Sequence, residues 1–197
     1  IESQIFIVPN QGRNFGPLVE ILSKLEVDFD FVLHIHTKRS QHMRKEQAEK
    51  WKTALFGNLL NPETMHALLS QMGQDKSIAV AYPQINHSVR SINMSWGLNF
   101  RPAEEWCLRA GIERPRYLTD FLFFPAGGMF LARKSHLMQL VDLGIRQSHF
   151  PVENGAFDGE LHHGIERIIG ALADLDGQSH VLIQDGALTK IRIVPRG

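Results

Sequence analysis

The sequence predicts an α/β domain with a mostly parallel sheet flanked by helices. Short apolar runs, rich in β-branched and aromatic residues, alternate with segments of helical period through the first half of the chain. This alternation is typical of a parallel sheet that is covered by helices on both faces. The 197 residues are 43% hydrophobic and 21% charged, which is ordinary for a chain that buries one core. No repeat, low-complexity tract or linker interrupts the chain, so residues 1–197 are expected to form a single domain.

Six apolar runs have the length of strands and are bounded by turn-forming residues. They occupy residues 4–8, 29–35, 77–82, 121–124, 128–132 and 190–194. The first run ends at Pro9 and Asn10, a pair that favours a turn. Because the chain opens directly into this run and has no initiator Met, we expect it to be part of a longer protein.

Five segments carry apolar residues at helical spacing or begin with residues that favour a helix start. They occupy residues 14–26, 44–52, 62–72, 134–143 and 158–173. Asn14 and Asp158 are residue types that cap helices, and Pro62 suits the first helical position. Gly144 is typical of a helix end. Residues 84–119 show no clear pattern.

Charge and cysteine content exclude several classes of protein. The 21 Lys and Arg residues balance the 21 Asp and Glu residues, so the basic excess of a broad nucleic-acid-binding surface is missing. No apolar run approaches the length of about 20 residues that a membrane span requires. The single cysteine, Cys107, excludes an internal disulfide and a cysteine-rich zinc site, which suits a reducing compartment.

Ligands of parallel α/β sheets bind at the carboxyl ends of the strands, and polar residues follow two of the expected strands there. Residues 10–17 form a glycine-containing turn before a helix, where backbone N–H groups favour an anion and Arg13 can bind phosphate bidentately. His34 and His36 lie two apart on one strand face and can converge on a metal or phosphate, with Lys38 adding positive charge. The alternatives are a plain turn and two buried histidines bonded to the backbone, followed by a solvated basic loop.

The segment from residue 150 to residue 167 is the third candidate. Asp158 lies at the expected start of a helix, whose dipole stabilises a carboxylate that can serve as a general base. The alternative is a helix cap with paired surface residues. His162 shares a helix face with Glu166, and His163 shares one with Arg167, but the spacing does not match a zinc motif.

Four ordered motifs, at residues 8–17, 30–40, 124–133 and 153–167, together resemble the rhamnan synthesis protein F family, which is associated with cell-surface polysaccharide assembly. The family commonly has Asp where this chain has Asn14. The family in turn resembles the GT-A glycosyltransferases, which bind a nucleotide-sugar donor on a Rossmann-like sheet. The resemblance implies that this chain lacks the first strand of that fold.

The same resemblance implies roles for particular residues. Asp158 corresponds to the base that deprotonates the acceptor hydroxyl. His34 and His36 occupy the place of the Asp-x-Asp motif, which grips the donor diphosphate through a divalent metal. Histidine suits Mn²⁺ better than Mg²⁺, and a metal-free version would use Lys38 and Arg13.

The expected function is therefore transfer of a sugar, in particular rhamnose, from a nucleoside-diphosphate donor to a cell-surface polysaccharide such as lipopolysaccharide O-antigen or rhamnan. The residues expected to bind substrate are Arg13, Asn14, His34, His36, Lys38, Trp96, Asn99, Gly127, Gly128, Glu160 and His162. The expected partners are a nucleotide-sugar donor, a glycan acceptor and membrane-associated polysaccharide-assembly proteins, with no nucleic acid. The expected location is cytoplasmic, at the inner face of the cell membrane. The alternatives are a non-catalytic carbohydrate- or nucleotide-binding domain and a histidine-metal phosphoester hydrolase.

Overall fold

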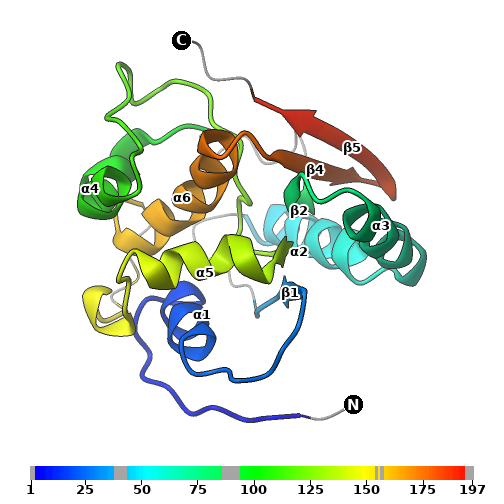
Figure 1. Ribbon diagram of the computed structural model, residues 1–197, viewed down its shortest axis with the longest axis horizontal. Helices are drawn as coiled ribbons and strands as arrows, with labels where there is room; N and C mark the ends of the chain where they lie inside the picture. The colour runs from blue at the N-terminus through cyan, green and yellow to red at the C-terminus, as the bar shows by residue number, and fades with distance from the viewer. Residues whose placement is uncertain (1–2, 38–43, 86–93, 154, 156–157, 194–197) are drawn as a thin grey trace.

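The structure is a computed structural model that describes residues 3–37, 44–85, 94–153, 155 and 158–193. These residues form a five-stranded sheet with helices on both of its faces (Figure 1). The strands are β1 (Phe31–His34), β2 (Ile78–Pro83), β3 (Phe130–Arg133), β4 (Ser179–Gln184) and β5 (Ala187–Arg192). Their order across the sheet is β1-β3-β2-β4-β5.

The expectation of a mostly parallel sheet is wrong, because only β2 and β4 pair in parallel among the described strands. β3 lies antiparallel between β1 and β2, and β5 pairs antiparallel with β4. A two-residue turn at Asp185 and Gly186, both with positive φ, joins β4 to β5 and permits only antiparallel pairing. The alternation of runs along a sequence identifies strands and helices but does not determine which strands become neighbours.

Within the described residues, six α-helices cover the sheet. They are α1 (Phe15–Leu22), α2 (Lys45–Leu59), α3 (Pro62–Gln74), α4 (Phe100–Arg109), α5 (Lys134–Asp142) and α6 (Leu161–Leu175). Two short 3₁₀-helices, η1 (Gly97–Asn99) and η2 (Gln147–His149), precede α4 and follow α5. The helices expected to begin near residues 14, 44, 62 and 134 are confirmed, and the side chain of Asn61 caps α3 by accepting from the Thr64 N–H at 2.9 Å.

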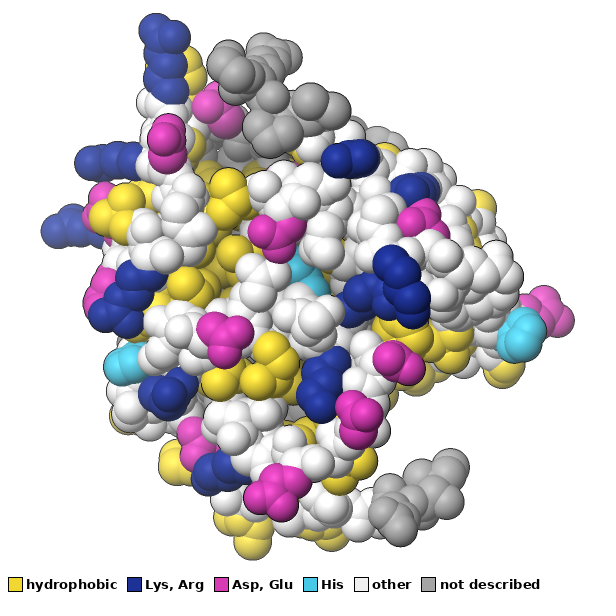
Figure 2. Space-filling view, in the orientation of Figure 1, with side chains coloured by type: hydrophobic (Ala, Val, Ile, Leu, Met, Phe, Trp, Pro, Cys, Tyr) yellow, Lys and Arg dark blue, Asp and Glu magenta, His cyan; other side chains and the backbone are white. Residues whose placement is uncertain are grey.

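The strand expected at residues 4–8 is wrong, because residues 3–10 contain no strand. Ile5 and Ile7 are 92% and 99% exposed, and the segment pairs with none of the described strands. Hydrophobic side chains project along the lower edge in Figure 2, where Figure 1 places this part of the chain. The run at residues 121–124 also forms no strand, and only Phe121 makes an isolated bridge, to Ser95.

Two hydrophobic cores lie on opposite faces of the sheet. α1, α4, α5 and α6 enclose the larger core, and α2 and α3 cover the other face (Figure 1). α6 contributes more buried residues than any other described helix. This packing holds the whole helix in place, including its amino end. Among the described residues, no helix is both long enough and apolar enough to cross a membrane.

Candidate functional site

The turn that precedes α1 is held tightly against the segment that follows η2. The Gln11 side chain donates to the Phe150 carbonyl at 2.5 Å, and Gln11 also forms a bridge with Val152. Gly12 packs on the Phe150 ring so closely that a Cβ at this position would lie 2.4 Å from it. Arg13 has φ of 50°, a left-handed conformation that is uncommon outside glycine. Such strain persists only where surrounding contacts enforce it, and it directs the Arg13 side chain toward α6.

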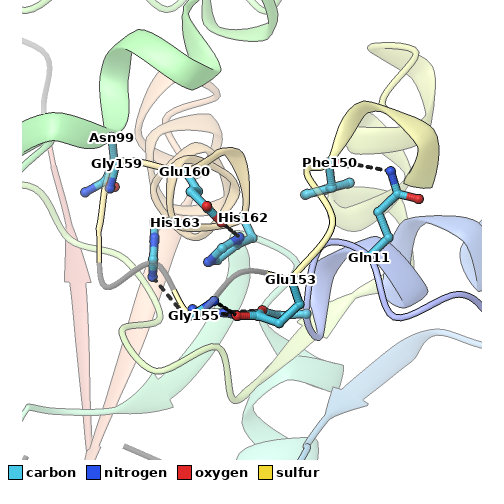
Figure 3. A network of polar contacts seen from close by, with 10 residues as sticks. Gln11, Asn99, Phe150, Glu153, Gly155, Gly159, Glu160, His162 and His163 are labelled. Carbon is cyan, nitrogen blue, oxygen red and sulfur yellow. Dashed lines mark hydrogen bonds and ion pairs between the residues drawn. The ribbon is translucent and has the colours of Figure 1, made fainter. Parts of the chain in front are cut away.

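Arg13 is the centre of a polar cluster that the sequence did not reveal. It donates to both carboxylate oxygens of Glu153, at 2.8 and 3.2 Å, and its Nη1 lies 3.4 Å from Nε2 of His163 (Figure 3). The Gly155 N–H also donates to Glu153, at 2.8 Å. These hydrogen bonds, led by the one from Arg13, lower the pKa of Glu153. Because 140 residues separate Arg13 from Glu153, no local pattern could have predicted the pair.

His162 lies beside this cluster at the start of α6. It is 3% exposed, yet neither ring nitrogen has a hydrogen-bond partner among the described residues. Its ring lies 4.1 Å from that of His163, and its Nδ1 lies 3.4 Å from a carboxylate oxygen of Glu160. Burial, reinforced by the charges of His163 and Arg13, lowers the pKa of His162 to about 3. The ring is therefore neutral at pH 7.

The helix expected to start at Asp158 instead starts at Leu161, with Glu160 at the N-cap position. Gly159 has φ of +78°, so the chain bends before the helix begins. The Gly159 N–H donates to Oδ1 of Asn99 at 2.9 Å, and this bond fixes the loop (Figure 3). Asp158 is exposed on that loop, outside the first helical turn, where the helix dipole acts less strongly. Asn99 itself is fully buried, and its Nδ2 has no hydrogen-bond partner.

A second cluster joins the end of β1 to the turn before β3. His34 Nδ1 donates to the Gly128 carbonyl at 2.7 Å, and His36 Nε2 lies 3.0 Å from the Gly127 carbonyl. Gly127 and Gly128 both have positive φ, and a Cβ on Gly128 would lie 2.5 Å from Nδ2 of Asn14. Burial lowers the pKa of His34 to about 4, with a smaller contribution from the charge of His36. Residues from three distant segments thus meet around the amino end of α1.

Backbone groups engage the rings of both histidines. Nδ1 of His34 bonds to the Gly128 carbonyl. In His36, Nε2 contacts the Gly127 carbonyl, and Nδ1 lies 2.9 Å from the Thr37 carbonyl. No group of three or more His, Cys, Asp or Glu side chains within the described ranges could hold a metal ion. Lys38 lies outside the described residues. Trp96 is 5% exposed and packs edge-to-face on Phe100 at 5.1 Å, which places it in the core.

A cavity of about 500 Å³ lies between α1 and β1, next to the second cluster. Asn14, His34 and His36 are its polar lining residues. The remaining lining residues are Pro17, Leu18, Ile21, Leu22, Leu25, Phe29, Phe31, Val32 and Ile35. A mostly apolar cavity with a few convergent polar groups is the usual form of a small-molecule site.

Buried neutral histidines predict a loss of stability in mild acid. The pKa values of His34, His136 and His162 fall from 6.5 to about 4, 4 and 3, mainly through burial. Below pH 6.5 the unfolded chain takes up protons that the folded protein cannot accept. Each histidine should therefore lower the free energy of unfolding by about 1.4 kcal/mol per pH unit between roughly pH 6 and 4.

Urea unfolding at pH 7.5, 6 and 5 measures this dependence. The matched variant is His136→Gln, because an amide can replace the bond from His136 Nε2 to the Ile169 carbonyl and does not titrate. We expect the variant to have a shallower pH dependence than the wild type. Equal slopes would show that His136 does not contribute.

The fold and its polar clusters define an α/β domain with a candidate site at the amino end of α1. The family described as rhamnan synthesis protein F matches residues 1–177, so the chain belongs to that family. It is also 29% identical over 171 residues to the uncharacterized protein WxcX from two strains of Xanthomonas campestris pv. campestris. These matches cover 86% of this chain and 24% of each relative, so the chain spans about a quarter of the curated relatives' length. No solved structure matches the chain significantly.

Proposed function

We propose that the chain is a glycosyltransferase domain of GT-A type that transfers a sugar, in particular rhamnose, from a nucleoside-diphosphate donor to a cell-surface polysaccharide. One observation carries the proposal. Polar residues of the β1 end, the Gly127–Gly128 turn and the start of α6 converge on the turn before α1. The chain also belongs to a family described as rhamnan synthesis protein F, and this membership supports sugar transfer as the reaction.

The donor would lie in the cavity between α1 and β1. Its polar lining residues, Asn14, His34 and His36, would face the ribose and diphosphate, and the apolar side chains would enclose the base. Positive charge from Arg13 and Lys38 would offset the charge that develops on the leaving diphosphate. The Glu153 carboxylate orients Arg13 and offsets part of its charge. Cationic side chains, and not a metal, would then stabilise the leaving diphosphate.

The acceptor would approach from the loop before α6. As an acceptor hydroxyl oxygen bonds to the anomeric carbon, Asp158 takes its proton, and the bond from that carbon to the diphosphate oxygen breaks. The electron pair of the broken bond leaves with the diphosphate. The exposure of Asp158, on a loop that the bond between Gly159 and Asn99 fixes, supports this role. The Glu160 carboxylate and the neutral His162 ring would hold other hydroxyls of the sugars.

Donor binding should raise the thermal stability of the intact protein. A panel of nucleoside diphosphates and nucleotide sugars, each tested with Mg²⁺, Mn²⁺ or EDTA, should give a shift for one nucleotide. A ligand at 100 times its Kd adds about 2.7 kcal/mol to the free energy of unfolding. We expect the shift to persist in EDTA and to shrink in a His36→Ala variant that remains folded.

A shift that needs Mn²⁺ would instead return the diphosphate to a metal held by His34 and His36. The absence of any shift in the intact protein would contradict the donor site.

A second candidate is a non-catalytic carbohydrate- or nucleotide-binding domain of a polysaccharide-assembly protein. The engagement of the His34 and His36 rings by backbone carbonyls favours it, because these rings are then structural. Slow hydrolysis of the donor in the absence of acceptor distinguishes an enzyme from such a domain. In either role we propose that the domain works with membrane-associated assembly proteins at the cytoplasmic face of the cell membrane.

A further inference from the structure

A group of large apolar side chains is exposed on the chain that surrounds η1. We call it the Phe121 surface, and it consists of Leu98, Tyr117, Leu118 and Phe121. Leu98, Phe121 and Tyr117 are 70%, 64% and 55% exposed, and Leu118 is 37% exposed. Large apolar side chains that are exposed close together in this way are typical of a binding surface.

Backbone contacts hold these residues next to one another. The Gly97 N–H donates to the Leu118 carbonyl at 2.8 Å, so η1 runs beside Leu118. Two residues before Gly97, Ser95 forms an antiparallel bridge with Phe121. The Phe121 ring also packs edge-to-face on Phe123, with ring centres 4.7 Å apart. The surface is therefore ordered by the fold, and binding would cost little conformational entropy.

The Phe121 surface is continuous with the proposed catalytic loop. The Cβ of Leu98 lies 3.7 Å from the position that a Cβ would take on Gly159. Gly159 directly follows Asp158, and the residue after Leu98, Asn99, holds the Gly159 N–H. A ligand that lies across the surface would therefore reach the carboxylate proposed to act as base.

We propose that the Phe121 surface binds the acceptor polysaccharide and guides its end toward Asp158, an inference that rests on the proposed function. A sugar ring has an apolar C–H face and a rim of hydroxyls, so it fits single aromatic rings set among polar groups. The surface has this character, because the Arg116 guanidinium lies 5.3 Å above the Tyr117 ring, and the exposed Asp120 directly precedes Phe121 in the sequence. A membrane surface would favour a continuous apolar face with clustered basic residues, and an exposed acidic residue within the same segment opposes it.

The test measures the binding of a defined rhamnose oligosaccharide to the intact protein by calorimetry. We expect Phe121→Ala and Tyr117→Ala each to weaken binding by about three- to tenfold, the size of an aromatic contact. The affinity for the nucleotide sugar should remain unchanged. Leu60→Ala is the matched control, since Leu60 is 48% exposed at the end of α2, away from this surface, and should leave both affinities as they are.

The outcomes separate this inference from the proposed function. If wild-type protein binds the oligosaccharide through Phe121 and Tyr117 but transfers no sugar, the surface stands as a glycan site and the glycosyltransferase proposal fails. If transfer occurs and folded variants bind the oligosaccharide as wild type does, the surface is not the acceptor site. Binding to anionic lipid vesicles that depends on Phe121, without binding of the oligosaccharide, would overturn the inference in favour of a membrane.

Discussion

Replacing Asp158 by Asn is expected to lower the rate of sugar transfer by about 10²- to 10⁴-fold, the usual contribution of a general base. Asparagine keeps the size and hydrogen bonding of the side chain but cannot take the acceptor proton. Donor affinity should not change, because the proposed donor cavity lies between α1 and β1, and Asp158 is not among its lining residues. The measurement is transfer to polysaccharide by the intact protein, together with donor affinity.

Asp185→Asn is a suitable control for this variant. Asp185 lies in the turn between β4 and β5 with φ of 49°, a left-handed conformation that Asn adopts readily. The control should match wild type in both stability and transfer. Unchanged turnover in a folded Asp158→Asn variant would remove Asp158 from the mechanism and direct attention to Glu160, which is also at the start of α6.

Replacing Gly170 by Ala is expected to destabilise the protein by about 3 kcal/mol, which corresponds to a fall in Tm of about 10 °C for a chain of this size. Inside a helix, Gly to Ala usually adds about 1 kcal/mol of stability. In α6, however, a Cβ on Gly170 would lie 1.9 Å from the Phe123 carbonyl oxygen and 3.0 Å from Cα of Phe124. Backbone atoms cannot move aside as a side chain can, so the helix would have to shift.

Gly57→Ala in α2 is the matched substitution, because nothing lies within 4 Å of a Cβ at that position. We expect this variant to gain up to about 1 kcal/mol. Urea and thermal unfolding of both variants measure the difference. If Gly170→Ala proved as stable as Gly57→Ala, the close packing of α6 against residues 123–124 would be incorrect.

Local patterns identified most helices because their signals lie within a few residues. Asn61 before Pro62 combines a cap with a first-turn proline, and α3 begins there. α4 was missed although its buried residues, Phe100, Ala103, Trp106 and Cys107, recur at helical spacing with charged residues between them. β4 was also missed, although the apolar residues after His180 form a short run typical of a buried strand.

In the candidate site, too, local motifs could be predicted from the sequence and long-range contacts could not. The motifs that contain Arg13, His34, Gly128 and Asp158 could be recognised from their residue types and their order along the chain. The ion pair between Arg13 and Glu153 could not, because it joins residues 140 positions apart. The start of α6 was predicted three residues too early, at Asp158 instead of Leu161. The bend at Gly159 that delays the helix depends on a hydrogen bond to Asn99, which lies in a different part of the chain.

The sequence by itself determined that this protein is an α/β domain with one cysteine, balanced charge and the motifs of a polysaccharide-synthesis family. Those properties follow from composition and from patterns of a few residues. Only the tertiary structure decided that the sheet is mixed, that residues 3–10 contain no strand, and that His34 and His36 contact backbone carbonyls. Strand pairing and burial depend on contacts between distant segments, and local periodicity carries no information about which distant segments meet.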